Sequence, residues 1–301
     1  MSTRTLNKKK NKKKAGWFTR MLLGKRKFVT HVRLTGSIGM GGPMSKSLSM
    51  EGVEETLEQA FALPGIECVA ISINSPGGSP VQSTLIFNRI RQLAKKHEVK
   101  VIVFCEDVAA SGGYLLAVAG DEIFADRSSI VGSIGVISAG FGFTDTLKKL
   151  GVERRVYTAG SNKSVLDPFL PAKKEDIAHL KALQMDVHEA FKDIVRSRRE
   201  KHLKGDEKEL FSGLFWAGDK AYERGLVDGL GSLNEVLQAR YGDDVIIKTI
   251  SASPGFSLRR LIMPGSRASS IESAARAAGE GAVSSATMLA EERALWSRYG
   301  L

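Results

Sequence analysis

The stretch Ala109-Ala110-Ser111-Gly112-Gly113-Tyr114 lies between two apolar runs, and the interpretation of the whole chain starts from it. The run before it, residues 99–104, predicts a buried strand, and the run after it, residues 115–119, predicts the start of a buried helix. We therefore expect Ser111 at a strand-to-helix turn, followed by two residues without a Cβ. Such a turn exposes a hydroxyl and directs backbone N–H groups to the same point, which suits a nucleophilic serine.

A second glycine turn, Asn74-Ser75-Pro76-Gly77-Gly78-Ser79, follows another apolar run at residues 68–73. Because α/β sheets bind ligands at the carboxyl ends of their strands, two such turns favour a binding site there. Glycine lets the backbone approach a substrate closely, so the N–H groups of Gly78 and Gly112 are the natural donors to an oxyanion. The alternative is that these glycines only form tight turns.

Predicted strands and helices alternate along most of the chain. This alternation predicts an α/β fold with a mostly parallel sheet and flanking helices. The predicted strands are 28–34, 68–73, 99–104, 122–125, 152–158 and 245–250, with a short β-rich stretch at 130–137. The predicted helices are 51–63, 80–97, 143–150 and 175–202, and a helix-turn-helix is expected over 215–240.

A serine hydroxyl needs a base to take its proton before it attacks. The histidines that follow the serine fall on one charged helix, where solvent exposure is expected: His179, His188 and His202. Lys163, in a Gly-Ser-Asn-Lys-Ser loop, is the other candidate, with Asp167 the nearest acid in the sequence. A lysine amine acts as a base only when it is neutral, which burial away from acids favours. A lysine in such a polar loop is more often simply exposed.

These features together resemble the signal peptide peptidase A family, which includes SohB-like relatives and has the ClpP/crotonase-type fold, a spiral of βαβ units. The resemblance covers about residues 28–250, and each motif alone is weak, but their order is specific. Besides the two glycine turns, it rests on Gly132-Ser133-Ile134-Gly135-Val136, Lys163-Ser164, Asp167-Pro168-Phe169 and Gly225-Leu226-Val227-Asp228.

The resemblance implies a serine endopeptidase that cleaves unfolded or signal-type peptides through an acyl-enzyme, without a cofactor or a metal. Ser111 would be the nucleophile and Lys163 the general base. The hydroxyl of Ser133 would hold the lysine amine, and Gly78 and Gly112 would form the oxyanion hole. Family members form rings or domes, such as octamers, in which the lysine can act on the serine of a neighbouring subunit.

The ends of the chain depart from the family. Residues 1–27 form a basic tail in place of the family's membrane-spanning helix, and residues 251–301 form an Ala/Ser-rich appendage with a predicted helix over 285–299. The first 28 residues hold eleven basic residues and no acid, which leaves 33 basic against 33 acidic residues elsewhere. We expect no transmembrane helix and no signal peptide, and a location in the cytoplasm or on the cytoplasmic face of a membrane. The first expectation for the basic tail is a solvated, disordered terminus; among partners, anionic lipid is favoured over nucleic acid.

Other chemistry finds little support in the sequence. The two cysteines, Cys68 and Cys105, lie in or next to apolar runs and are expected to be buried thiols. No Cys/His cluster has the spacing of a metal site. Two further functions remain open: a crotonase-type acyl-CoA enzyme, for which Glu106 and Asp107 are the nearest acids, and a catalytically inactive scaffold recruited to membranes.

Overall fold

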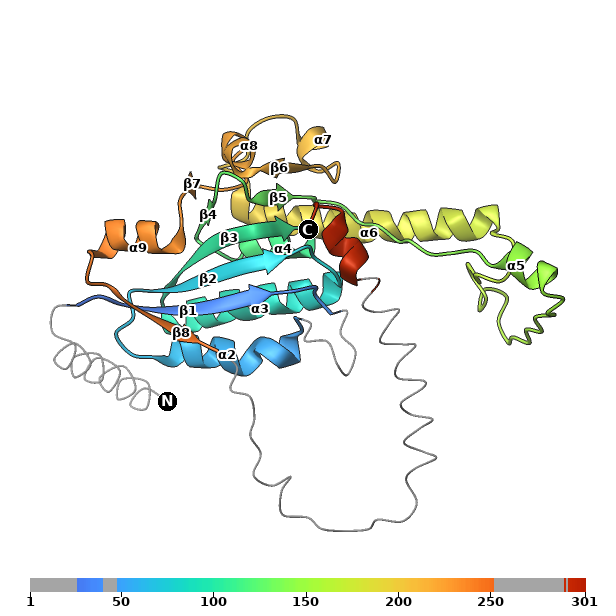
Figure 1. Ribbon diagram of the computed structural model, residues 1–301, viewed down its shortest axis with the longest axis horizontal. Coiled ribbons are helices and arrows are strands. Elements are labelled where there is room, and N and C mark those ends of the chain that lie inside the picture. Colours follow the sequence, from blue (N-terminus) through green and yellow to red (C-terminus); the bar gives the residue numbers. More distant parts are fainter. Residues whose placement is uncertain (1–25, 40–47, 252–289, 291) are drawn as a thin grey trace, which may run out of the picture.

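The computed structural model describes residues 26–39, 48–251, 290 and 292–301. Its centre is a sheet in the order β6-β5-β3-β2-β1-β8, with β4 beside β3 and β7 beside β4 (Figure 1). All strand pairs are parallel except β5 with β6, which confirms the mostly parallel α/β fold. The strands are β1 (Phe28–Thr35), β2 (Cys68–Ser75), β3 (Lys100–Ala110), β4 (Glu122–Ala125), β5 (Ile130–Gly132), β6 (Phe215–Ala217), β7 (Gly229–Leu230) and β8 (Ile246–Ile250).

Helices cover both faces of this sheet, because its central strands are apolar on both sides. β2 is buried at every position. Its residues Val69 and Ile71 belong to the larger core cluster, which also contains Ile86. Cys68 and Ala70 belong to a second cluster on the other face, which contains Leu237. The helices are α2 (Met50–Ala62), α3 (Pro80–His97), α4 (Gly112–Ala117), α5 (Thr144–Lys149), α6 (Lys174–Arg199), α7 (Glu207–Leu210), α8 (Gly218–Glu223) and α9 (Leu233–Tyr241).

The glycine turn after β2 leads directly into α3, as the sequence predicts. The Ser79 hydroxyl caps this helix by accepting from Gln82 N–H, and Pro80 occupies its first turn. Its buried side chains, among them Ile86 and Ile90, pack into the larger core cluster. The chain therefore crosses from the C-terminal end of β2 to a packed helix within five residues, which fixes the position of the turn.

Three local predictions are wrong. The strand predicted over 99–104 continues as β3 to Ala110. The register between β2 and β3 shifts at Glu106 and Asp107, and the pairing resumes when Ser75 meets Ala109. Residues 152–158 form no strand: they are exposed and have no partner strand in the described parts of the chain. Between residues 215 and 240, the predicted helix-turn-helix also contains β6 and β7, which are too short to show a period-2 pattern.

One segment projects from this body. Residues 136–173, which we call the projecting arm, run from β5 past α5 to the start of α6, and Figure 1 shows α5 at the far end of α6, away from the sheet. The buried residues of α6 are Phe191, Val195 and Arg199, all in its C-terminal half. The projecting arm exposes large apolar side chains, and Phe141 and Tyr157 are 82% and 91% exposed.

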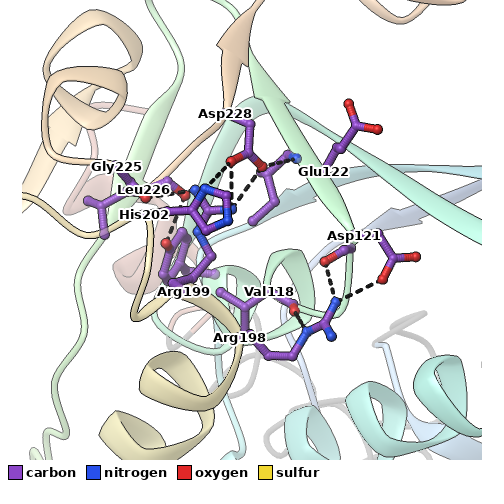
Figure 2. A network of polar contacts seen from close by, with 12 residues as sticks. Val118, Asp121, Glu122, Arg198, Arg199, His202, Gly225, Leu226 and Asp228 are labelled. Carbon is purple, nitrogen blue, oxygen red and sulfur yellow. Dashed lines mark hydrogen bonds and ion pairs between the residues drawn. The ribbon is translucent and has the colours of Figure 1, made fainter.

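A buried ion pair holds the C-terminal end of α6 to the sheet (Figure 2). Arg199, which is 3% exposed, donates to both carboxylate oxygens of Asp228 at 2.9 and 2.8 Å and to the Gly225 carbonyl at 2.7 Å. Asp228 also accepts from the N–H of Ile123 in β4 at 2.8 Å. The Tyr114 hydroxyl of α4 donates to the Leu226 carbonyl at 2.8 Å. The Gly225–Asp228 motif therefore joins α6, β4 and the helix that follows Ser111.

Candidate active site

Ser111 lies where β3 ends and α4 begins, as predicted. Its backbone has φ 52° and ψ −122°, a conformation that is unfavourable for a residue with a side chain. Its N–H donates to the Gly132 carbonyl at 2.8 Å, and its carbonyl accepts from Leu115 N–H at 3.0 Å. The fold therefore holds a half-buried serine in a strained turn, which is the local geometry of an exposed nucleophile.

The second glycine turn packs directly against this serine. A Cβ placed on Gly77 would lie 2.8 Å from both the Gly112 nitrogen and the Ser111 Cβ, so no side chain fits between the two turns. Within the described residues, the N–H groups of Gly78 and Gly112 donate to no protein acceptor. Two free amides beside one serine hydroxyl fit the requirement of an oxyanion hole.

Gly78 is expected not to tolerate a side chain. Its φ is +144°, and a Cβ would lie 2.1 Å from the Ile38 carbonyl oxygen. We predict that Gly78→Ala shifts the turn and lowers kcat for peptide hydrolysis by about 10²-fold, the usual cost of losing one oxyanion donor. Gly52→Ala is the matched control, because there a Cβ meets only the Ser49 hydroxyl at 3.3 Å. Equal kcat values for the two variants would argue against Gly78 in the site.

Ser133 comes to the same place through strand pairing. Ala110 pairs with Gly132, so the residues that follow the two strands, Ser111 and Ser133, are neighbours at one edge of the sheet. Ser133 has φ 53° and donates its N–H to the Leu214 carbonyl at 2.7 Å. The structure thus brings together four of the five predicted site residues.

The fifth, Lys163, does not meet Ser111 within the single chain. Its loop is held to the start of α6, where Leu166 N–H donates to Asp176 at 3.2 Å. Asp176 and His188 are separated by roughly 18 Å along the axis of α6. His188 lies level with the site, because its Nε2 is 3.1 Å from the Ile134 carbonyl oxygen. Lys163 is exposed at the far end of the projecting arm and contacts neither serine within the described residues.

The acid nearest to Lys163 in the sequence is engaged elsewhere. Asp167 accepts from the Phe169 N–H at 3.0 Å and from Arg154 at 2.7 Å. Both hydrogen bonds lower the pKa of the Asp167 carboxyl, and the one from the Phe169 N–H has the larger effect. The lysine amine therefore has no carboxylate partner among the described residues.

Other nucleophiles and bases are less suitable. Burial raises the pKa of the Cys68 thiol to about 11 and that of Cys105 to about 12, so neither is a thiolate near neutral pH. The expectation of three solvated histidines is wrong for His188, which is half-buried and bonded to Ile134, and His202 lies beyond the end of α6 beside Asp228. His179 is exposed, as expected.

The acids that an acyl-CoA enzyme would need are also occupied. Glu106 accepts from Arg33 at 2.6 Å, and Asp107 accepts from the Asn74 amide at 2.6 Å. These pairs stabilise the irregular part of β3. They argue against the crotonase-type alternative, which requires a carboxyl group free to move a proton.

Sequence reasoning missed one residue at the site. Tyr299 donates its hydroxyl to the Ser133 hydroxyl at 3.3 Å, and its ring meets that of Phe215 edge-on at 5.1 Å. The available signal was the apolar side predicted for the C-terminal helix, which includes this tyrosine. Of that predicted helix, residues 285–289 and 291 lie outside the described residues.

A strained serine beside two glycine amides that have no acceptor among the described residues, on a mostly parallel sheet, agrees with the ClpP-like class of serine hydrolases. The model of a ClpP-like SDH-type serine proteinase matches residues 3–150, and that of peptidase family S49 matches residues 93–242. The putative protease slr0021 of Synechocystis sp. is 32% identical over 213 residues, covering 71% of this chain and 73% of that protein. The chain belongs to peptidase family S49, a family of serine proteases with relatives named SppA, protease 4 and SohB.

Other relatives match over smaller parts of their length. The putative signal peptide peptidase SppA of Enterococcus faecium is 29% identical, covering 64% of this chain and 57% of that protein. A Brucella abortus protein named Na(+)/H(+) antiporter NhaA is 56% identical over 90% of this chain, which spans only 36% of that protein. A solved structure of a mutant of the 1510-N membrane-bound stomatin-specific protease aligns with a TM-score of 0.46 at 15% identity, covering 76% of this chain and 99% of the other.

Two kinds of feature are absent from the described residues. Among them, no helix combines the length and the apolar character that crossing a membrane requires. The same residues contain no cluster of three or more His, Cys, Asp or Glu side chains arranged to hold a metal ion.

Proposed function

We propose that this chain is a serine endopeptidase in which Ser111 of one subunit is activated by Lys163 of a neighbouring subunit. The observation that carries the proposal is the strained Ser111 beside the amides of Gly78 and Gly112, which donate to no acceptor in the described parts of the chain. Membership of a serine-protease family supports the same chemistry. The separation of Lys163 from Ser111 within one chain favours a base supplied by another subunit.

The proposed reaction has two halves. The Ser111 Oγ attacks the peptide carbonyl carbon while its proton passes to the neutral amine of Lys163, and the two amides stabilise the oxyanion. The C–N bond then breaks, and the lysine returns the proton to the leaving amine. Water attacks the acyl-enzyme with the same lysine as base, releasing the acid and restoring Ser111.

The projecting arm is the element we propose to form the assembly, a ring or dome of identical subunits. It exposes a set of large apolar side chains that the body of the same chain leaves uncovered. Packing on a neighbouring copy would bury them and bring Lys163 into an apolar site, as a neutral amine requires. The exposed members of this set are Ile137, Phe141, Phe143, Leu150, Val152, Val156, Tyr157 and Leu170.

Labelling with a fluorophosphonate, which modifies activated serines, tests this function. We expect mass spectrometry to find the adduct on Ser111, and hydrolysis of unfolded peptides to disappear in Ser111→Ala. Ser138→Ala is the control, because this serine is exposed on the projecting arm. An unlabelled Ser111 in a chain that assembles but cleaves nothing would instead support the inactive scaffold.

For substrate and location, we propose signal-type or unfolded peptides cleaved at the cytoplasmic face of a membrane. The support is the excess of basic residues in the first 28 positions, which attracts anionic lipid. Vesicles containing phosphatidylserine are expected to bind the full chain, and deletion of residues 1–25 is expected to abolish that binding. Equal binding to neutral vesicles would contradict an electrostatic attachment.

A further inference from the structure

The C-terminal segment, residues 290 and 292–301, lies at the carboxyl ends of β3 and β5 (red in Figure 1). It is helical over 292–297 and ends in a turn. Tyr299 is 9% exposed and forms a cluster with residues of β3. The members of this cluster are Val108, Ala110 and Tyr299, with Ile130 and Trp296 packed against them.

Polar contacts fix the segment on both sides of Ser111. On one side, the Ser37 hydroxyl donates to Glu292 at 3.1 Å, and Ser37 directly precedes Ile38, whose N–H bonds the Gly77 carbonyl at 2.8 Å. On the other side, the Tyr299 hydroxyl donates to Ser133 at 3.3 Å. The segment therefore reaches from the glycine turn that contains Gly77 to Ser133, the serine expected to hold the lysine amine.

We propose that this C-terminal segment is a built-in inhibitor that occupies the place where the neighbouring subunit's Lys163 must dock. The inference rests on the proposed function, because Ser133 is the hydroxyl expected to hold that amine. Tyr299 already bonds this hydroxyl and fills the space beside Ala110, the residue before the nucleophile. A lysine side chain and the tyrosine ring cannot share this position, so activation requires the segment to leave.

The contact is strong enough to persist within one chain and weak enough to be displaced. It includes the two hydrogen bonds above, the edge-on contact of Tyr299 with Phe215 and one small apolar cluster, and the covalent connection to the domain supplies a high effective concentration. The projecting arm of a second subunit offers a larger apolar surface. Assembly would therefore replace the C-terminal segment at this site by the projecting arm of the neighbouring subunit. The rate of peptide hydrolysis per chain should then rise with protein concentration.

Truncation after residue 289 tests this directly. If the segment is docked in about nine of ten sites, its removal should raise the rate of peptide hydrolysis by about tenfold. Tyr299→Ala in the full chain should give a similar increase, whereas Tyr222→Ala should give none, because Tyr222 is 48% exposed and lies on α8. A synthetic peptide of residues 290–301 should inhibit the truncated chain, and the same peptide with Tyr299→Ala should not.

A second measurement separates the two proposals. Fluorescence anisotropy of the labelled 290–301 peptide reports binding to the truncated chain without any hydrolysis. No binding, together with equal hydrolysis by full and truncated chains, overturns the inhibitor and leaves the protease intact. Binding with no hydrolysis and no fluorophosphonate adduct in either chain overturns the proposed function, and the inhibitor with it.

Discussion

A mixture of Ser111→Ala and Lys163→Ala chains is expected to regain peptide hydrolysis that neither variant shows alone. Each variant by itself should lose at least about 10³-fold in kcat, because nucleophile and base act as one unit. In a mixed assembly, some sites combine the intact Ser111 of one chain with the intact Lys163 of its neighbour. Random assembly of equal amounts gives about a quarter of such sites, so about a quarter of the parental rate should return.

The controls separate assembly from catalysis. Lys149→Ala removes another exposed lysine of the projecting arm and should retain full activity. Sedimentation velocity should show that all variants form the same particle as the parent chain. If mixed particles form and remain inactive, the dyad does not act between subunits. If Lys163→Ala alone retains full activity, this lysine is not the base.

Loss of the Asp228 carboxylate is expected to destabilise the fold by about 3–5 kcal/mol, because Asp228→Ala leaves the charge of Arg199 buried without a carboxylate partner. Arg199 is 3% exposed, and its guanidinium donates to Asp228 at 2.9 and 2.8 Å. The Ile123 N–H loses its acceptor in the same variant. Urea unfolding followed by circular dichroism should show a midpoint far below that of the parent.

Asp219→Ala is the matched control for this prediction. Asp219 also accepts from an arginine, Arg127, at 3.0 Å, but that arginine is largely exposed to solvent. Exposed ion pairs contribute little to stability, so the unfolding midpoint should hardly change. Asp228→Asn keeps acceptor capacity and should lie between the two. A midpoint for Asp228→Ala equal to that of Asp219→Ala would show that the buried pair does not hold α6 to the sheet.

Local sequence signals predicted the long helices well. The spacing of apolar residues and the proline after the glycine turn gave α3 with the bounds the structure has, Pro80–His97. Single-residue effects such as capping act within a few residues, so they can be recognised in the sequence alone. The short strands β6 and β7 could not be recognised in this way, because two or three residues carry no periodicity and form strands only beside β5 and β4.

The sequence by itself indicated the residues that we propose carry the chemistry of the site: a serine followed by two glycines at a strand end, a second glycine turn and a lysine in a polar loop. Only the tertiary structure decided their distances. It joined Ser111 to Ser133 through the pairing of β3 with β5, and it placed Lys163 on the projecting arm, in a loop held to the start of α6. It also brought Tyr299 to Ser133 across 166 residues. The physical reason is that motifs are local, whereas strand register and the packing of a terminal segment depend on contacts between distant residues.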